Sequence, residues 1–381
     1  MTTLAITGDL HVDDLLPKID PATGWSASFE DGIAAIRFVG RTAVERSAEA
    51  LVVAGDYTER RSPAPPRVAR ILGALHDGPG RQVHVRGNHD QERSGHSIVD
   101  VLGAVDGWTG LTKPGVELVG DVAICAIPFL SPTYLRAQDG YETADIASVN
   151  RALAEAYLTI ARGLYVSAQS LGASTTILVG HQQLAGGRMN DSQAAFLGDR
   201  DLVVDSRALA AIGFGAVVFA HVHRAQTVID DPACPVVFTG STHRVDWAEE
   251  HEDKSFVFLK AEAGRVSIER IPIPARRFVT LDFAADPTAG DDWPDRVPGA
   301  IVRVLNVLPS DDVTEIRRQL EAAGAFEVSE IRRRPVEAPE SNGGLSETLT
   351  APEALEAYFA DDPDREILVE RGRALLTEVA A

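Results

Sequence analysis

The sequence predicts an α/β layered fold, on two main observations. Short apolar runs rich in Val and Ile recur through the first two-thirds of the 381-residue chain, and segments with helical periodicity lie between them. The composition, 45% apolar and 24% charged, is that of an ordinary globular protein and excludes a disordered or collagen-like chain. At roughly 150 residues per domain, the length allows two domains and a small third piece.

Five apolar runs are typical of strands buried on both faces, because each is short and ends in Gly or Ala followed by polar residues. They are residues 4–8, 51–55, 83–87, 175–180 and 216–220. Helical patterns cover about residues 30–50, 66–76 and 146–171, and the second follows a proline-rich start. The alternation of these segments indicates a layered domain over residues 1–274.

After about residue 274 the pattern changes to a strand at 300–308, a helix at 311–323 and a second strand at 326–333. These elements predict a small β-α-β unit over residues 275–335. The polar segment 336–348 contains Pro and Gly and predicts a linker. Residues 349–381 predict two helices, the first with a capping box of Thr350 and Glu353.

Charge and cysteine content limit the function classes. The net charge is −20, from 36 Lys and Arg against 56 Asp and Glu, and so acidic a surface repels nucleic-acid phosphates unless basic residues or metal ions reverse the field locally. The two cysteines, Cys125 and Cys234, cannot build a disulfide framework. No apolar run approaches the ~20 residues of a membrane helix, and the N-terminus lacks a basic stretch before an apolar core. We therefore expect a cytoplasmic protein without a membrane partner.

Each of the five predicted strands is followed at once by residues that can hold a metal ion or assist catalysis. They are Asp9, His11, Asp56, Asn88, His89, Asp90, His181, His221 and His223. The carboxyl ends of strands in an α/β sheet line one edge, so these side chains are expected to converge. Oxygen and imidazole donors without a thiolate favour Mn, Fe or Zn. Seven candidate ligands are too many for one tetrahedral ion and enough for two ions about 3.5–4 Å apart, which can clamp a phosphoryl group and generate hydroxide near neutral pH.

The motifs GDLH, GD, GNHD, GH and HVH, in this order, resemble those of the calcineurin-like metallophosphoesterases. More narrowly, IPFLSPTYLR at 127–136 and TGSTHRVDWAEEHEDKSFVF at 239–258 resemble the SbcD family, the nuclease subunit of a double-strand-break repair complex. The resemblance implies a four-layer α/β/β/α sandwich at 1–274, a capping domain at 275–335, the linker at 336–348 and C-terminal helices at 349–381 that dock an ATPase.

The resemblance also implies roles for individual residues. One metal would be held by Asp9, His11, Asp56 and His223, and the other by Asp56, Asn88, His181 and His221, with Asp56 bridging. His89 would act near the scissile phosphate, and Asp90 would orient it. Manganese is the expected ion, with magnesium, iron or zinc as alternatives.

Other positions are left open by the sequence. His243 and Arg244 lie in the SbcD-like stretch and are candidates for either substrate binding or a structural contact. Arg276 and Arg277 are suited to DNA phosphates or to a solvated face. Glu59 stands where SbcD relatives often carry a second active-site histidine, three residues after the bridging Asp.

The implied function is a two-metal DNA phosphodiesterase with 3′-to-5′ exonuclease and single-strand endonuclease activity in DNA repair, recombination or replication. Its implied partners are DNA, an SbcC-like coiled-coil ABC ATPase and a second copy of the chain. One alternative is a phosphoesterase for small phosphoesters or cyclic nucleotides. A second alternative is a docking scaffold without chemistry.

Overall fold

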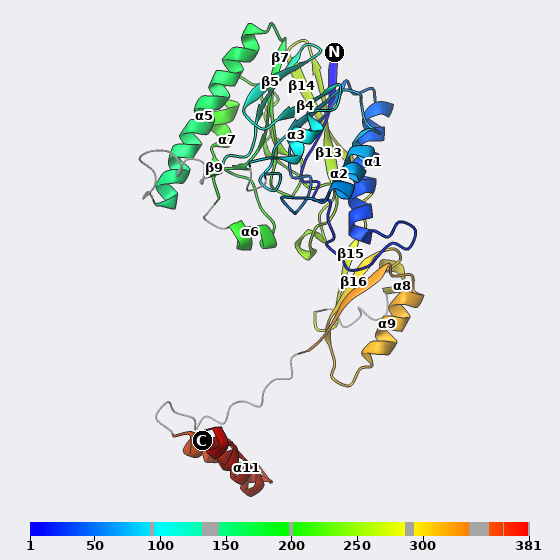
Figure 1. Ribbon diagram of the computed structural model, residues 1–381, viewed down its shortest axis with the longest axis vertical. Coiled ribbons are helices and arrows are strands. Elements are labelled where there is room, and N and C mark those ends of the chain that lie inside the picture. Colours follow the sequence, from blue (N-terminus) through cyan, green and yellow to red (C-terminus); the bar gives the residue numbers. More distant parts are fainter. Residues whose placement is uncertain are drawn as a thin grey trace.

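The computed structural model describes residues 1–91, 95–131, 145–197, 201–285, 293–334, 350–360 and 362–379. Its largest part is a sandwich of two six-stranded sheets with helices on both outer faces (Figure 1). This arrangement confirms the predicted four-layer α/β/β/α fold.

The first sheet contains the first three predicted strands. In spatial order it consists of β14 (Arg265–Pro272), β13 (Ser255–Glu262), β1 (Thr2–Thr7), β2 (Ala50–Val53), β3 (Gln82–Val85) and β4 (Trp108–Leu111). Strands β1 to β4 run parallel, whereas β13 pairs antiparallel with β1 and with β14.

The second sheet contains the other two predicted strands. In spatial order it consists of β11 (Gln226–Ile229), β12 (Val236–Phe238), β10 (Ala216–Ala220), β7 (Thr175–His181), β6 (Val122–Ile127) and β5 (Gly115–Val119). Its four central strands are parallel and its two edge strands are antiparallel to their neighbours. A short ladder joins β8 (Gln183–Leu184) to β9 (Val203–Val204).

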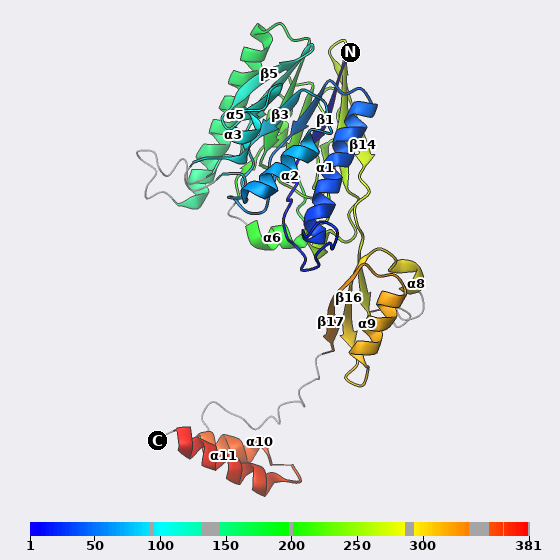
Figure 2. The ribbon, with the colours of Figure 1, turned by 45° about the vertical axis from the view of Figure 1, so that its right-hand side comes forward.

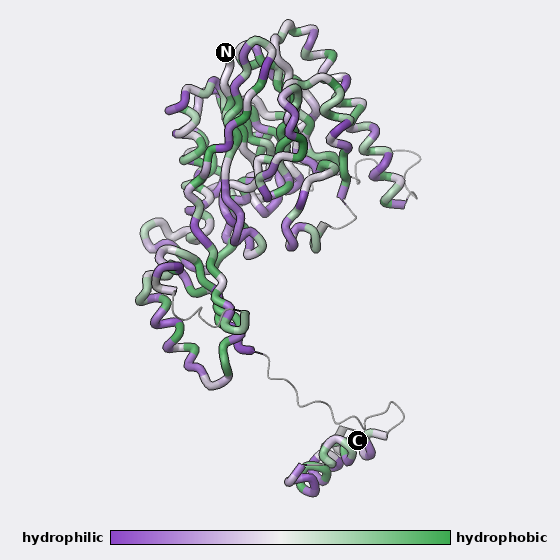
Figure 3. Tube along the Cα trace, turned by 180° about the vertical axis from the view of Figure 1, so that it is seen from behind, coloured by the Kyte–Doolittle hydropathy of each residue, from purple (hydrophilic) through white to green (hydrophobic). Residues whose placement is uncertain are grey.

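The core follows from strand alternation, because successive side chains of a strand point to opposite faces. Leu4 and Ile6 of β1 lie between the two sheets, in one cluster with Ile124 and Val179 of the second sheet. Ala5 points the other way, into the cluster beneath the outer helices. In Figure 3 the apolar colour is accordingly concentrated in the interior of the sandwich.

The outer helices lie close to their predicted ranges. One face carries α1 (Ala27–Glu45), α2 (Pro65–Leu75) and α3 (Ile98–Leu102), and the other carries α5 (Ile146–Ser170) and α7 (Ser206–Ala210). Helix α1 begins where the hydroxyl of Ser26 accepts a hydrogen bond from the N–H of Phe29. It ends earlier than predicted, because Ser47 turns the chain at φ 57° into β2. Helix α6 (Asp191–Leu197) lies at the lower end of the sandwich in Figure 1.

A small second unit follows the sandwich (Figure 2). Its parallel sheet, β15 (Phe278–Asp282), β16 (Ile301–Val307) and β17 (Glu327–Arg333), is accompanied by α8 (Trp293–Arg296) and α9 (Val313–Ala322). The sequence predicted β16, α9 and β17 but not β15. The carboxylate of Glu250, in the sandwich, accepts a hydrogen bond from the backbone N–H of Thr280 in β15 (2.7 Å).

The C-terminal region forms a helical hairpin of α10 (Ala351–Tyr358) and α11 (Arg365–Val379). The predicted linker at 336–348 lies outside the described residues. Within the described ranges, no helix is both long and apolar enough to span a membrane. Cys125 and Cys234 are both buried and unpaired.

Candidate metal centre

The carboxyl ends of four strands, β1, β2, β7 and β10, meet at one edge of the sandwich and bring together two groups of side chains. Asp9, His11 and His223 make the first group, and Asp56, His181 and His221 make the second. Within each group one ligand atom per residue lies within 4.8 Å of the others, and all six side chains are buried. These six residues were among the seven expected ligands, and each group falls within one of the two expected ligand sets.

Asp56, a member of the second group, also faces the first group. Its Oδ2 is 3.1 Å from Nε2 of His181 and 3.7 Å from Nε2 of His11. The seventh expected ligand, Asn88, belongs to the second group, because its Oδ1 is 2.9 Å from Nε2 of His181 and 3.0 Å from Nδ1 of His221. A carboxylate between two donor sets is the arrangement that a shared ligand requires.

The four ligand imidazoles are all held by an oxygen on their outer nitrogen. Nδ1 of His181 donates to the carbonyl of Ala54 (2.6 Å), and Nδ1 of His223 lies 2.7 Å from Oε1 of Glu249. Nε2 of His221 lies 2.8 Å from Oδ2 of Asp201. An acceptor on one ring nitrogen fixes the tautomer and leaves the other nitrogen's lone pair for a metal.

His11 follows the same pattern through a different residue. Its Nδ1 is 2.9 Å from Oε2 of Glu59, an ion-pair distance whose angle falls short of a hydrogen bond. Its inner Nε2 faces Nε2 of His223 at 3.0 Å. Two imidazole nitrogens can face each other this closely only with a cation or a proton between them.

The loops hold their ligands in a backbone conformation that side chains other than Gly rarely adopt. Asp9, His11, Asp56 and His221 have φ values of 49°, 39°, 58° and 94°. Among the described residues, only three other non-glycine residues have positive φ. Such strain is typical of functional sites, where the surrounding structure enforces it.

Two glycines allow the loops to approach one another. A Cβ on Gly87 would lie 2.1 Å from Oδ1 of Asp56, and one on Gly55 would lie 2.5 Å from the backbone nitrogen of Gly87. The glycines of the GD and GNHD motifs are therefore required by close packing.

The electrostatics of the site favour a bound cation. Burial lowers the pKa of His11, but the carboxylates of Glu59, Asp56 and Asp9 reverse this and raise it to about 9. Burial likewise opposes the charged form of His181, but Asp56 and Asp9 raise its pKa to about 10. The pKa of Asp56 lies well below its usual range despite burial, because His181, His89 and His11 favour its anion. The carboxylates stabilise positive charge on these buried imidazoles. The same negative potential would stabilise bound divalent ions more strongly than it stabilises protons.

The residues present therefore fit two divalent metal ions. The donors are carboxylate, amide and imidazole groups, which suit Mn, Fe or Zn, and the buried thiols of the chain are elsewhere. Such a pair of ions supplies Lewis-acid stabilisation of a phosphoryl group and activation of water.

His89 lies at the rim of the centre. Its side chain is 25% exposed, and its ring centroid is 5.3 Å from that of His11. Nδ1 of His89 donates to the carbonyl of Glu59 (2.9 Å), which leaves Nε2 for another partner. This position is compatible with the expected role beside a scissile phosphate.

Asp90 has a different role from the one expected. We expected its carboxylate to orient His89, but it accepts hydrogen bonds from the backbone N–H groups of Asp56, Tyr57 and Gly87 (2.7, 2.8 and 2.7 Å). Burial and the charge of Asp56 raise its pKa to about 6, which these three donors oppose. Asp90 thus fixes the backbone of the loops that carry the ligands.

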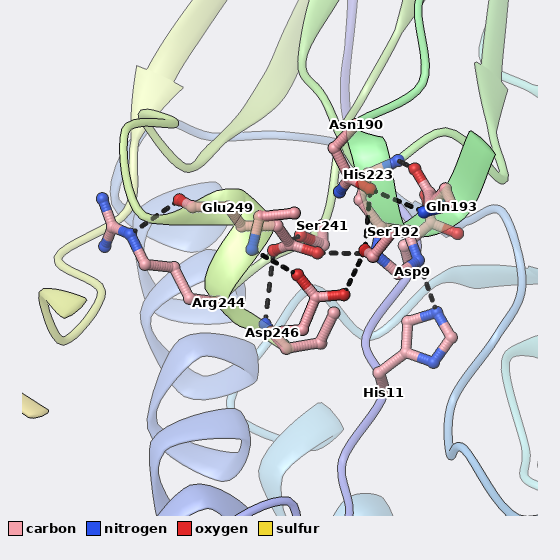
Figure 4. A network of polar contacts seen from close by, with 12 residues as sticks. Asp9, His11, Asn190, Ser192, Gln193, His223, Ser241, Arg244, Asp246 and Glu249 are labelled. Carbon is pink, nitrogen blue, oxygen red and sulfur yellow. Dashed lines mark hydrogen bonds and ion pairs between the residues drawn. The ribbon is translucent and has the colours of Figure 1, made fainter. Parts of the chain in front are cut away.

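His243 and Arg244 are engaged within the fold. His243 is 3% exposed, and burial lowers its pKa to about 3. The guanidinium of Arg244 donates to the backbone carbonyls of Glu249, Glu252 and Arg276 (3.1, 2.7 and 2.9 Å). In Figure 4 Arg244 points away from the side chains of His11 and His223. Of the two roles left open by the sequence, the structure favours the structural contact.

Sequence reasoning missed the support behind His223. Glu249 is fully buried, and its other oxygen, Oε2, lies 2.7 Å from Nζ of Lys254. The same oxygen accepts from Oγ of Ser241 (3.0 Å), and Figure 4 shows Glu249 and Ser241 side by side. Lys254 is itself only 3% exposed. The pKa of Glu249 is held well below its usual range, because His223 and Lys254 outweigh the effect of burial.

Gln193 of α6 forms hydrogen bonds to the backbone of one ligand from each group. Its side chain accepts from the N–H of His223 (3.1 Å) and donates to the carbonyl of His221 (3.0 Å). Glu249 and Lys254 lie in the SbcD-like stretch at 239–258, but the motif did not indicate a role for either residue. No pattern in the sequence pointed to Gln193 or Asp201.

The chain has matches among protein families and among solved structures. A family model described as calcineurin-like phosphoesterase matches residues 2–225. The search of curated proteins returned no match. Among solved structures, a dimetal phosphatase from Danio rerio is 9% identical with a TM-score of 0.45, and the match covers 71% of this chain and 95% of that one. A purple acid phosphatase from yellow lupin (Lupinus luteus) is 11% identical with a TM-score of 0.45, covering 71% of this chain and 51% of that one.

Proposed function

Because this chain belongs to the calcineurin-like phosphoesterase family, we propose that it is a dinuclear, metal-dependent phosphodiesterase that cleaves DNA. The observation that carries the proposal is the pair of donor groups on either side of Asp56. The family and this site support metal-dependent phosphoester hydrolysis. DNA as the substrate is the narrower part of the proposal.

Different side chains of the site would bind the metal ions, transfer a proton and position the loops in such a reaction. Asp9, His11 and His223 would hold one ion, and Asn88, His181 and His221 the other, with Asp56 shared between them. In its doubly protonated form, His89 would present Nε2–H to the phosphate and give that proton to the leaving sugar oxygen, because its Nδ1–H is already bonded to the carbonyl of Glu59. Asp90 and Gln193 would hold the ligand-bearing loops in place while the charge on the phosphate changes.

The resemblance to SbcD supports DNA rather than a small phosphoester. Its motif at 239–258 supplies Glu249, which contacts His223, and Lys254, which pairs with Glu249. The motif at 127–136 supplies Phe129, whose ring centroid is 5.6 Å from that of His221, while residues 132–136 lie outside the described part of the chain. The expected activities are 3′-to-5′ exonuclease and single-strand endonuclease, with manganese as the first ion to test.

The regions beyond the sandwich support a macromolecular assembly. We propose that the unit of β15–β17 is a capping domain and that α10 and α11 dock an SbcC-like ABC ATPase. Tyr358, Ile367 and Leu375 of these helices are 49%, 62% and 60% exposed. A second copy of the chain would complete the assembly.

The test is an assay of the purified chain, stripped of metal, on end-labelled linear DNA and on closed circular single-stranded DNA. Manganese, magnesium and zinc are restored in turn. Metal-dependent shortening of the linear DNA from its 3′ end is the expected result. Hydrolysis of a model diester or a cyclic nucleotide with intact DNA would instead identify a small-substrate phosphoesterase. Copurification with an ATPase and no metal-dependent hydrolysis of any substrate would point to a scaffold.

A further inference from the structure

A second feature of the sandwich is a cavity of about 760 Å³ outside the metal centre. Five basic side chains line it, against the two carboxylates of Glu252 and Asp253. They come from four separate segments and are Arg224, Arg244, Lys254, Arg270 and Arg277. In a chain with a net charge of −20, such a concentration of positive charge is a local exception.

Two of these arginines have only neutral acceptors. Arg270, on β14, donates through Nη2 to the carbonyls of Gln226 and Phe238 (2.6 and 2.9 Å), and its buried Nη1 has no hydrogen-bond partner among the described residues. Arg244 is likewise bonded to backbone carbonyls. Burial lowers the pKa of both guanidinium groups, which means that their charge is partly desolvated. Neither forms an ion pair in the described part of the chain. The carboxylates of Glu249, Glu250, Glu252 and Asp253 lie near Arg244 and offset its charge, so it is chiefly Arg270 that leaves positive potential in the cavity wall.

The other cations are arranged differently. Lys254 is neutralised by Glu249 and Glu252 (2.7 and 2.9 Å), so one of the two lining carboxylates is already occupied. Arg224 and Arg277 are exposed, and within the described ranges neither forms an ion pair. The cavity thus combines two half-buried guanidinium groups in its wall with two exposed ones at its edge, of which Arg277 also donates through Nη2 to the carbonyl of Pro298 (3.1 Å).

We propose that this cavity is a binding site for phosphate groups, distinct from the metal centre. Guanidinium groups bind phosphate oxygens with paired N–H donors, and several of them facing one space suit a ligand with more than one phosphate. The volume is in the range of pockets that hold a nucleotide-sized ligand. The phosphates belong either to a nucleic-acid strand or to a free polyphosphate or nucleotide, and the site stands whether or not the metal centre cleaves DNA.

Titration calorimetry of the full-length chain, with its metals, tests the proposal at low salt. The probes are sodium tripolyphosphate and a short single-stranded oligonucleotide. The main variant is Arg224→Ala with Arg277→Ala, because both side chains are exposed and, among the described residues, the change removes one hydrogen bond, from Nη2 of Arg277 to the carbonyl of Pro298 (3.1 Å). The control is Arg265→Ala, which removes an exposed arginine from the other end of β14, outside the cavity. Ligation of the metal ions by either probe, and any cleavage of the oligonucleotide, occur in all three proteins, so a difference between the proteins reports the cavity.

The double variant should bind at least one of the probes about tenfold or more weakly than the wild type, because each phosphate contact to a charged donor is lost. The Arg265→Ala control should bind like the wild type. Oligonucleotide binding that tripolyphosphate displaces identifies a nucleic-acid backbone as the source, whereas binding of tripolyphosphate alone identifies a free phosphate compound. Equal affinities of the wild type and the double variant for both probes would overturn the proposal.

Arg270→Lys provides a second measurement that keeps the charge but removes the fork of N–H donors. It should fold, and it should weaken binding of the probe that the wild type binds. Unchanged binding in this variant together with unchanged binding in the double variant would leave no role for the cavity.

Discussion

Replacing Glu249 tests whether this buried carboxylate positions a metal ligand. Glu249 accepts from Nδ1 of His223 at 2.7 Å and pairs with Lys254 at the same distance, so it serves two partners at once. Removing the carboxylate that orients a ligating histidine typically weakens metal affinity by about 10- to 100-fold. We therefore expect Glu249→Ala to lose about two orders of magnitude in manganese affinity and Glu249→Gln about one.

The stability effect can be worked out from the same contacts. Removing one partner of a buried ion pair destabilises a protein by about 3–5 kcal/mol. Lys254 would keep Glu252 at 2.9 Å, so the lower end applies. A loss of about 3 kcal/mol lowers Tm by roughly 6–12 °C in a domain of this size. The pKa of Glu249 lies below its ordinary value of 4.5, so its contribution is fully present above that pH and declines as the pH falls below it.

Lys254→Met is the matched control, because it breaks the same ion pair but leaves the carboxylate on His223. Thermal unfolding should show destabilised Glu249→Ala and Lys254→Met proteins. Calorimetric titration of manganese, in competition with a chelator, should show a large loss of affinity only in the Glu249 variants. Equal losses of affinity in Glu249→Ala and Lys254→Met would refute the reasoning, since they would show a general loosening of the fold.

Three further predictions concern the centre itself. His89→Ala should reduce phosphodiester cleavage by about 10²- to 10⁴-fold while metal content by elemental analysis stays unchanged, because His89 is outside both donor groups; loss of metal along with activity would make it a ligand. Gly87→Ala should abolish metal binding in equilibrium dialysis, because the new Cβ would lie 2.1 Å from Oδ1 of Asp56; a variant that still binds two ions would show that the loops can move apart. In metal-free protein, His11 and His181 have pKa values raised to about 9 and about 10 from an ordinary 6.5. Protonation of these two histidines contributes stability that is complete below pH 6.5 and is lost as the pH rises through 9 and 10. The Tm of the metal-free protein should therefore fall over this interval. A Tm that does not change with pH would contradict the proposed effect of the carboxylates on His11 and His181.

The site could be predicted from the sequence where a residue suited to metal binding directly follows an apolar run typical of a strand. The run ending at Gly55 is apolar and Asp56 follows it, so both the strand and the position of the carboxylate at its end could be predicted. The same reasoning placed Asp9 and His181 at the same edge. Parallel strands bring their carboxyl ends together whatever their distance along the chain.

Other features depend on contacts that no local pattern records. Strand β14 alternates between half-buried and exposed residues at the edge of its sheet, so it lacks the continuous apolar run of the central strands. Asp90 follows His89 in the sequence, but the turn directs its carboxylate to the backbone of Asp56 and Gly87 instead. Glu249 reaches His223 from a 3₁₀ turn at Trp247–Glu249, and only the folded chain shows that contact.

Anomalous diffraction from crystals grown with manganese tests the dinuclear centre most directly. Two peaks about 3.5–4 Å apart are expected, with the carboxylate of Asp56 touching both. Asp9, His11 and His223 should surround one peak, and Asn88, His181 and His221 the other. A single peak, or peaks that do not share Asp56, would contradict the two-metal account.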